Sequence, residues 1–465
     1  MPLLGGNGRV LVAVVLGLVV GAAPASAAPG DVDTGFASGG VFTPAFQTTF
    51  PGAEGSQEVA VDSQGRVYLA ATLENAPGGG TPRKVNVLRL SARGVLDTGW
   101  GTGGTATLPF PGDTRLSGLA IDSQDRAVIA GANSESSAAM VAIARLTTSG
   151  QPDPGFSGDG WEVTALSGAS TAAPDGVAVD DSDRPLVVST ITTGGCPGAG
   201  CVVAGMVSRF TTAGALDGGY GVSGSRQVGD AGMRMGGIVA LPGGAAYAAG
   251  YDDYLTWVVG RLTSDGALDN GFDGDGLAST DLGRTGLDLV SNYGVTADAQ
   301  GRPILTGQYT GSTAKAAVAR FTSSGAPDPT FGGTPIAGAT FIGGVEGGRA
   351  RSPIVCGSRI LLTGSGSRPG NTGNGMFLAA LGDGGALDAS FAPGSTTPGV
   401  TTLSLGQYNI GMDLAQAGAG VLVSGFRRTF PPLEDFPTLA RFSAACGDEP
   451  SGGGGEPTPP APTPP

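Results

Sequence analysis

The chain has 465 residues, of which 86 are glycine and 33 are proline, and 40% of it is hydrophobic. A glycine and proline share of about a quarter is typical of disordered chains unless it recurs with a period, whereas this hydrophobic content is enough to build a core. The net charge of −14 argues against a nucleic-acid partner. The chain has no histidine, which excludes Ser-His-Asp catalysis, Cys-His catalysis and histidine metal sites.

The first 27 residues have the pattern of a signal peptide. Arg9 is the single charge before an apolar run of about ten residues, 11–20, which is short for a membrane span. Ala25-Ser26-Ala27 then provides a cleavage site of small residues. We expect cleavage after Ala27, export to the cell surface or the medium, and no membrane insertion of the mature chain.

Short boxes made of an aspartate, two further residues and an aromatic residue recur through the chain. Their spacings are 64, 56, 64, 52, 59 and 60 residues, and such a long, regular period is typical of a repeat architecture. The seven boxes are Asp33 to Phe36, Asp97 to Trp100, Asp153 to Phe156, Asp217 to Tyr220, Asp269 to Phe272, Asp328 to Phe331 and Asp388 to Phe391.

Each repeat contains the signals of four short strands. A tight polar turn joins two apolar runs, as in 59–70 and 119–130, a third run ends in Arg-Leu or Arg-Phe, and a glycine-flanked segment follows the box. Four-stranded units repeated radially predict an all-β fold, a seven-bladed β-propeller over residues 28–446. A β-solenoid would have shorter coils, and independent domains of about 60 residues would bury too little surface, so both alternatives are less favoured.

The strand order within a blade also follows from the pattern. The two turn-linked runs suit the inner strands, the Arg-Leu run the third strand, and the segment after the box the outermost strand. The first outer strand, 41–46, then precedes any inner strand, and no fourth strand follows 438–442 in the last repeat. We therefore expect the N-terminal strand to complete the last blade, which would close the ring and protect a sheet edge.

An arginine precedes the box aspartate by eight residues in five repeats, as Arg89 precedes Asp97. A ring of ligand-binding charges is one interpretation. Because one role repeated in every unit is typical of architecture, we favour an arginine that braces the wide loop and an aspartate that caps its turn. The aromatic residue is then a packing anchor. No box follows Arg441, and the expected ring closure makes Asp33 its partner.

The four cysteines are compatible with disulfides in an exported protein. Cys196 and Cys201 flank a turn, which suits a local bridge better than a metal site. By elimination, Cys356 pairs with Cys446 or both stay free. A bridge between these two is favoured because their loops are expected on the same face of adjacent blades, provided that the Cα atoms lie about 4.4–6.8 Å apart.

The best metal candidate is a weak one. Asp269, Asp273 and Asp275 alternate before glycines and resemble the start of a calcium loop, but the bidentate glutamate of such a loop is absent. A simple Gly-Asp turn is the favoured interpretation. We expect no other metal and no cofactor.

The chain ends in a segment of different composition. Residues 447–465 contain a run of glycines and then a proline-rich stretch, and we expect them to be a disordered tail.

The repeat unit, best represented by 265–272, resembles the bacterial delta-60 repeat (DUF5122) β-propeller family over roughly residues 31–445. The resemblance implies a secreted or surface-displayed propeller and no established catalytic residues. The chain departs from the family pattern at Ala380, which stands in place of the arginine, and in weak hairpins near 353–364 and 414–425.

For function, we expect a non-catalytic, monomeric binding or scaffolding module that takes an unknown protein or glycan ligand at a propeller face. The alternative is an extracellular carbohydrate-active hydrolase or lyase that uses paired carboxylates. Inward-facing carboxyl groups with a raised pKa at one channel mouth would favour the enzyme. A channel lined by glycine, alanine and serine would favour the scaffold.

Overall fold

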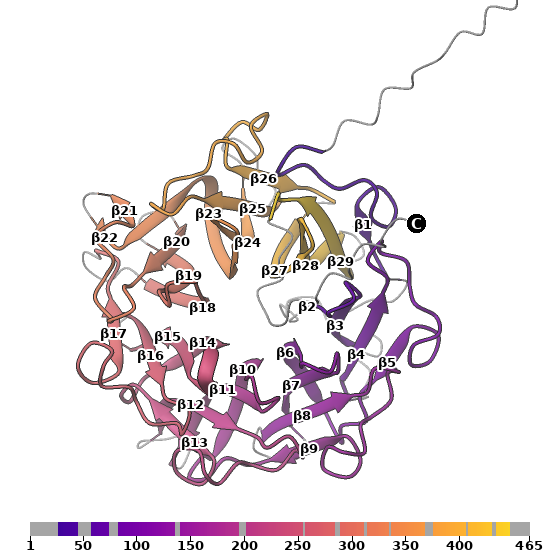
Figure 1. The fold of residues 1–465 in the computed structure, drawn as a ribbon, viewed down its shortest axis with the longest axis vertical. Coiled ribbons are helices and arrows are strands. Elements are labelled where there is room, and N and C mark those ends of the chain that lie inside the picture. The colour runs from indigo at the N-terminus through magenta and orange to yellow at the C-terminus, as the bar shows by residue number, and fades with distance from the viewer. Residues whose placement is uncertain are drawn as a thin grey trace, which may run out of the picture.

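The structure is a computed structural model, and it describes most of the chain after the expected signal peptide. Within these residues the protein is all-β, with sheets arranged around a central channel (Figure 1). No helix of the described part is long and apolar enough to cross a membrane. The described ranges are 27–44, 57–73, 82–134, 140–194, 201–253, 256–283, 289–310, 314–333, 336–367, 375–405, 408–429 and 434–446. Residues 1–26 and the tail 447–465 lie outside them.

Four sheets each contain four consecutive antiparallel strands in their order along the chain. The first sheet contains β2 (Gln57–Val61), β3 (Val67–Leu73), β4 (Lys84–Leu90) and β5 (Thr105–Thr107), and the second contains β6 (Thr114–Ile121), β7 (Ala127–Asn133), β8 (Met140–Leu146) and β9 (Trp161–Thr164). The third contains β10 (Thr171–Val179), β11 (Pro185–Thr193), β12 (Val202–Arg209) and β13 (Ser225–Val228). The fourth contains β14 (Arg234–Ala240), β15 (Ala246–Tyr251), β16 (Trp257–Leu262) and β17 (Leu277–Thr280). A short 3₁₀ turn, η1 (Pro242–Gly244), precedes β15.

In the next sheet one long strand serves two neighbouring units, which gives a path of seven strands, and the short strands β21 and β22 bring the total to nine. The first half of β23 pairs with β20 and its second half pairs with β24, with register shifts between the two halves. The strands are β18 (Leu289–Ala297), β19 (Pro303–Thr310), β20 (Ala314–Arg320), β21 (Gly332–Gly333), β22 (Ile336–Ala337), β23 (Ala339–Cys356), β24 (Arg359–Ser367), β25 (Gly375–Leu381) and β26 (Val400–Leu403). The sequence pattern did not predict this continuous strand; positive φ angles at Gly344 and Gly347 let it turn between its two partners.

The last sheet joins the two ends of the described chain. It contains β27 (Tyr408–Ala417), β28 (Gly420–Thr429), β29 (Glu434–Ser443) and, on its outer edge, the N-terminal strand β1 (Val41–Phe42). Val41 pairs with Ala440 and Phe42 pairs with Leu439. Gly30 also donates its backbone N–H to the carbonyl of Ser443 at 2.6 Å.

The fold is a β-propeller, and the strand order predicted for its units is confirmed. If the nine-stranded sheet is counted as two blades that share β23, the described strands give seven blades. This count, and the closure of the whole ring through β1, stay an interpretation of the strand pairing.

The hydrophobic core lies between adjacent sheets. One cluster packs Tyr68 and Trp100 from the first sheet against Leu119 and Ile129 from the second, and related clusters follow around the ring. The aromatic residue of every box is fully buried, as the packing-anchor interpretation predicted. Each such side chain contributes about 1.5–3 kcal/mol by burial.

An arginine-centred brace repeats at the loop between the third and fourth strands, and Arg145 shows it clearly. Its Nε lies 2.7 Å from Asp153 Oδ2, and its Cζ lies 5.0 Å from the ring centroid of Phe156. Its Nη1 donates to the carbonyl of Thr212 in the next sheet at 2.6 Å. The guanidinium therefore ties its own loop, the box aromatic residue and the neighbouring blade together.

The box aspartate caps the turn as predicted. Asp153 Oδ1 accepts the backbone N–H of Gly155 at 2.9 Å. Burial acts to raise the pKa of Asp153, but this hydrogen bond and Arg145 hold it below its usual range. The corresponding ion pairs are Arg89 with Asp97 at 2.7 Å, Arg209 with Asp217 at 2.8 Å, Arg261 with Asp269 at 3.2 Å and Arg320 with Asp328 at 2.8 Å.

The last repeat takes its aspartate from the N-terminal segment. Arg441 Nε lies 3.4 Å from Asp33 Oδ2, and the backbone N–H of Asp33 donates to the carbonyl of Arg441 at 2.9 Å. Arg441 Nη1 also donates to the carbonyl of Ala92 in the first sheet at 3.1 Å. The structure thus brings together the pair that the sequence suggested.

In the sixth repeat an arginine from a different strand replaces the missing one. Arg359, at the start of β24, lies 2.6 Å from Asp388 Oδ2 and donates to the carbonyl of Ala444 at 2.9 Å. Ala380 occupies the usual position on β25. The spacing of eight residues could not reveal this substitution, because Arg359 reaches the aspartate from the neighbouring strand.

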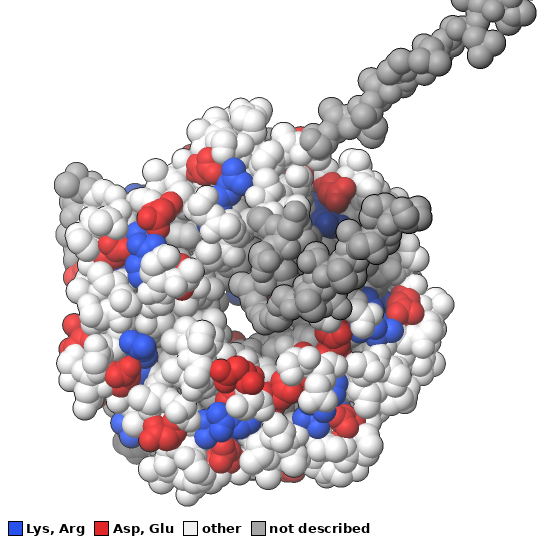
Figure 2. All heavy atoms as spheres, viewed as in Figure 1, with Lys and Arg blue, Asp and Glu red and all other residues white. Residues whose placement is uncertain are grey.

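A second set of ion pairs occupies the hairpin turns between the two inner strands. Arg126 Nε lies 2.7 Å from Asp122 Oδ2, and Asp125 accepts the backbone N–H of Ser63 in the preceding sheet at 2.9 Å. Figure 2 shows acidic and basic side chains lying beside one another in groups around this view of the ring. Most charges on the described part of this face are therefore paired within the architecture.

A disulfide joins the end of β23 to the segment after β29. Cys356 and Cys446 have Cα atoms 4.9 Å apart, so the bridged alternative is confirmed. Cys196 lies outside the described residues, and the Cys196–Cys201 bridge stays a prediction.

Replacing a brace arginine should cost stability in proportion to its burial. Arg145→Leu removes the nearer partner of Asp153 from a nearly closed site and leaves only the more distant Arg126, 3.4 Å away, so we expect the free energy of unfolding to fall by about 3 kcal/mol. In Arg261→Leu, the matched control, both partners are about one-third exposed, and we expect a loss below about 1 kcal/mol. Chemical denaturation measures both values, and equal losses would contradict the assigned role of the buried brace.

Candidate functional site

The calcium candidates are not gathered into a metal site. Asp269 pairs with Arg261 and accepts the backbone N–H of Gly271 at 2.9 Å, and Asp275 accepts that of Leu277 at 2.9 Å. Asp273 has a φ of 51°, and its backbone N–H donates to the next blade. In the described ranges, no group of three or more acidic or cysteine side chains could hold a metal ion. The turn interpretation therefore accounts for these three residues.

A cavity of 470 Å³ lies between the turn that precedes β19 and the short turn that joins β23 to β24. Three arginines line it, Arg302, Arg320 and Arg359. Each already has acidic partners; Asp383, for example, lies 2.6 Å from Arg302 and 2.7 Å from Arg320. These guanidinium groups are occupied by internal ion pairs, so we do not assign this cavity as the ligand site.

The inner strands carry β-bulges that alter which side chains face the central channel. Pairing shifts by one residue at Ser117, Asp175, Gly236, Tyr293, Ser352 and Met412, each on a different inner strand. A bulge interrupts the alternation of side chains between the two faces of a strand, so it can direct a side chain to the opposite face. All six of these residues line one cavity in the channel.

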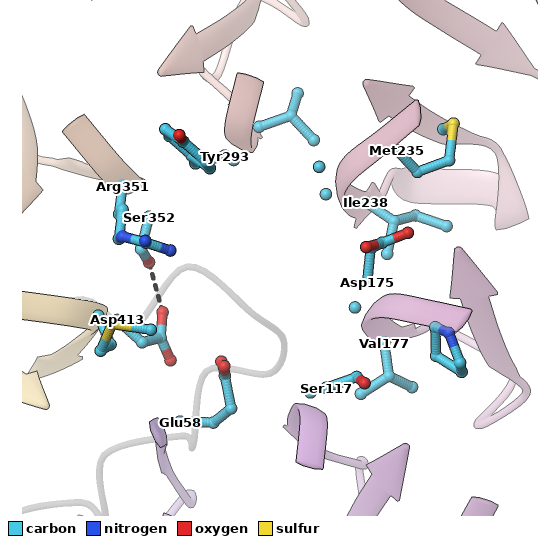
Figure 3. Close-up of a pocket in the computed structure, with 18 of the residues that line it drawn as sticks. Glu58, Ser117, Asp175, Val177, Met235, Ile238, Tyr293, Arg351, Ser352 and Asp413 are labelled. Atoms are coloured by element: carbon cyan, nitrogen blue, oxygen red, sulfur yellow. Dashed lines mark hydrogen bonds between the residues drawn. The ribbon is translucent and has the colours of Figure 1, made fainter. Parts of the chain in front are cut away.

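This channel cavity has a volume of 460 Å³, and the carboxyl groups that reach it come from opposite walls. Glu58 on β2 and Asp413 on β27 extend toward each other from neighbouring walls, and Asp175 on β10 points into the cavity from the other side (Figure 3). Arg351 on β23 also lines the cavity. The remaining lining includes Tyr251, Tyr293, Met235, Val177 and Ile238 and several glycines, among them Gly118, Gly176, Gly237 and Gly294.

Glu58 and Asp413 form a coupled carboxyl pair. Asp413 Oδ2 accepts the backbone N–H of Val59 at 3.0 Å, and its Oδ1 accepts the hydroxyl of Ser352. These donors favour its charged form, although burial raises its pKa. Burial, and then the charge of Asp413, raise the pKa of Glu58 well above its ordinary value. The two carboxyl groups interact, so the protonation of each depends on the other.

Asp175 is held by one residue of the neighbouring strand. Thr190 on β11 donates to Asp175 Oδ2 through its backbone N–H at 2.9 Å and through its hydroxyl at 2.8 Å. Burial raises the pKa of Asp175 to about 7, against the opposing effect of these two hydrogen bonds. The group can therefore accept or donate a proton near neutral pH.

The positive charge in the cavity is positioned by an aromatic ring. Arg351 Cζ lies 4.7 Å from the ring centroid of Tyr293, a cation–π arrangement. Arg351 also acts to lower the pKa of Glu58, but burial has the larger effect. The cavity thus combines the guanidinium of Arg351, the interacting carboxyl groups of Glu58 and Asp413, and Asp175, whose pKa is about 7.

The structure separates the predicted structural residues from the residues of the channel. Arg89, Asp97, Asp33 and Arg441 belong to braces, whereas the sequence analysis identified no channel residue. One signal was available: Ser117, Asp175, Gly236 and Tyr293 each precede a glycine and each lie five positions before a turn position, Asp122, Asp180, Leu241 and Asp298. Both features proposed as discriminators, raised carboxyl pKa values and a glycine-rich lining, occur in the same cavity.

Comparison with known proteins finds distant likenesses among solved structures. No family model and no curated protein matches the chain. A protein of unknown function from Dyadobacter fermentans DSM 18053 is 11% identical, with 87% of this chain and 99% of that one covered and a TM-score of 0.42. A polysaccharide lyase is 10% identical, with coverage of 86% and 92% and a TM-score of 0.44.

The β-propeller domain of the Trilobed protease from Pyrococcus furiosus is also similar. It is 9% identical, with coverage of 85% and 97% and a TM-score of 0.42. Likenesses of this size carry no argument about this chain. The assignment to the delta-60 repeat family stays a prediction.

The titration of Asp175 should appear in the stability of the protein. Its pKa is about 7 when folded but about 3.9 in an unfolded chain, so the stability that it contributes is full at low pH and is lost as the pH rises through 7. Relative to Asp175→Asn, we expect the wild type to lose about 2.6 kcal/mol between pH 5 and pH 8. Denaturant unfolding of both proteins at both pH values measures this difference. Parallel pH profiles would refute the raised pKa.

Proposed function

We propose that the protein is an exported, monomeric binding module of the β-propeller class and that its ligand occupies the channel cavity. The observation that carries this proposal is the convergence of Glu58, Asp175, Arg351 and Asp413 on one concave site of 460 Å³. Ligand sites are typically concave and combine apolar walls with a few placed polar groups. The pattern of residues 1–27 and the Cys356–Cys446 disulfide support export.

An aromatic side chain introduced into the channel cavity should block ligand binding. Ser117→Phe fills part of the cavity, whereas Val95→Phe adds the same ring at a position that is 63% exposed and outside the cavity lining. The measurement is a binding screen against a glycan array and a peptide library. We expect Ser117→Phe to lower the affinity for captured ligands at least about tenfold and Val95→Phe to leave this affinity unchanged. Circular dichroism checks that both variants are folded.

Two results would contradict the proposal. One is a screen in which the wild type captures no ligand. The other is capture that Ser117→Phe leaves as strong as in the wild type, which would place the binding site elsewhere.

The second candidate is a carbohydrate-active hydrolase or lyase. Raised pKa values of Glu58 and Asp175 in one cavity favour it, because catalytic acids and bases need such values. Incubation with a polysaccharide panel, followed by assays for new reducing ends and for unsaturated products, tests it. Turnover by the wild type that Glu58→Gln and Asp175→Asn abolish would replace the binding module with an enzyme. Binding without turnover supports the module.

A further inference from the structure

Resting on the proposed export, we infer that hydrolysis of the bond between Ala27 and Ala28 gives the propeller its mature form, and that the α-ammonium group released at Ala28 pairs with the carboxylate of Asp31. A repeat loop that is divided between the N-terminal and C-terminal segments carries this inference. The ion pair holds the N-terminal half of that loop in place.

In six repeats, a loop of four consecutive residues follows the third strand. In 147–150, the first carbonyl accepts the N–H of Gly150 at 2.9 Å, and the third carbonyl accepts the N–H of Gly101, in the preceding blade, at 2.8 Å. The second carbonyl accepts the brace Arg89 of that blade at 2.7 Å. The equivalent loops are 91–94, 211–214, 263–266, 322–325 and 382–385. Each of these loops therefore links its own blade to the preceding one.

The last repeat takes its copy of this loop from two distant parts of the chain. Ser443 and Ala444, after β29, form the first half, and Pro29 and Gly30 form the second half. The N–H of Gly30 donates to the carbonyl of Ser443 at 2.6 Å, and the N–H of Ala392, in the preceding blade, donates to the carbonyl of Pro29 at 2.6 Å. Figure 1 shows the N-terminal segment running beside the last sheet. The contacts of a continuous loop are therefore kept, although no peptide bond joins the two halves.

The two halves of the divided loop are held in different ways. The disulfide between Cys356 and Cys446 links the C-terminal half to the preceding blade. Arg359 of that blade also donates to the carbonyl of Ala444 at 2.9 Å. Within the described residues, hydrogen bonds and packing hold the N-terminal half, 29–30, in its place. A contact at the free end of this half therefore matters more than one at the cross-linked half.

Ala28 directly precedes the divided loop, and a carboxylate faces its nitrogen. Asp31 Oδ2 lies 3.1 Å from the backbone nitrogen of Ala28, and the N–H of Asp31 donates to the carbonyl of Ala28 at 2.9 Å. In the precursor this nitrogen is a neutral amide. Once Ala28 is the first residue, its α-amino group, with an ordinary pKa of about 8, is mostly charged at neutral pH. The contact with Asp31 then becomes a charge-assisted hydrogen bond, which is the stronger kind.

The processing step is a hydrolysis by a signal peptidase, and it consumes one water molecule. The water oxygen bonds to the carbonyl carbon of Ala27 as the C–N bond to Ala28 breaks. Ala27 then ends in a carboxyl group, and the nitrogen of Ala28 becomes an amino group that takes up a proton from solvent. Ala25 and Ala27 provide the small residues of the cleavage site, and Ala27 is exposed. Cleavage two residues further on would remove Pro29 and the carbonyl that Ala392 uses.

Export of the full-length chain by a bacterial host tests the processing site. We expect N-terminal sequencing and intact mass of the exported protein to show a chain that begins at Ala28. Ala27→Leu should prevent processing at this bond, because the cleavage site requires a small residue there. Ser26→Leu, the matched control, adds the same side chain at the unrestricted middle position and should be processed like the wild type. An exported wild-type chain that begins at any other residue would overturn the assigned site.

Hydrogen exchange measured by NMR tests the ion pair. The mature chain is compared with a form that carries one added glycine, in which the nitrogen of Ala28 is again a neutral amide. The N–H of Ala392, bonded to Pro29, should exchange about twofold to fivefold faster in the extended form. In Asp31→Asn the added glycine should leave this rate unchanged, because the carboxylate is gone. The N–H of Ser157, which bonds to an intact loop, should exchange equally in all forms.

The outcomes separate this inference from the proposed function. Equal exchange at Ala392 in the two N-terminal forms would overturn the ion pair, as would an equal effect of the added glycine in the wild type and in Asp31→Asn. If processing occurs at another bond, the inference fails, whereas export and the channel site stand. If the chain is not exported, the inference fails together with the export part of the proposed function, and the ligand screen still tests the channel.

Discussion

One guanidinium per repeat determines how neighbouring blades sit against each other. A blade presents apolar faces on both sides, and such faces can pack at many angles. The brace removes this freedom. In four of the described repeats, those of Arg89, Arg145, Arg209 and Arg320, the arginine pairs with its own loop aspartate, lies over the buried aromatic residue and donates to the next blade. Arg145 makes all three contacts with a side chain that is 3% exposed. The geometry of the channel depends on this repeated arrangement, because the inner strands belong to the sheets that the braces hold together.

The channel departs from the regularity of the braces. Bulges on six described inner strands interrupt the alternation of side chains along the strand. Each bulge creates a position that faces the channel, and a different residue occupies that position on most of the strands. Asp175, Tyr293, Ser352 and Met412 have little in common chemically, although their backbone sites are equivalent. Variation at repeated positions is typical of a site on a scaffold, whereas the repeated arginine and aspartate are typical of the scaffold itself.

These two parts of the molecule also differ in how far the sequence predicts them. The period of the boxes, their aromatic residues and the spacing of Arg89 from Asp97 predicted the strand order and the braces. Arg359 was missed because a neighbouring strand supplies the guanidinium, a substitution that has no fixed spacing. The channel residues were missed because a bulge reverses which side chains point inward, so period-two alternation misplaces Asp175 and Ser352. The raised pKa of Glu58 depends on Asp413, 355 positions away in the sequence, and no local pattern connects them.

The central claim is that the channel gathers carboxyl groups with raised pKa values into a ligand site. An NMR titration of the side-chain carboxyl carbons of Glu58, Asp175 and Asp413 tests it directly. The account predicts that Glu58 and Asp175 titrate well above the usual range of carboxyl groups, that the curves of Glu58 and Asp413 are coupled, and that Asp413→Asn moves the curve of Glu58 downward. A Glu58 that titrates near its ordinary pKa in the wild type, unaffected by Asp413→Asn, would contradict the account.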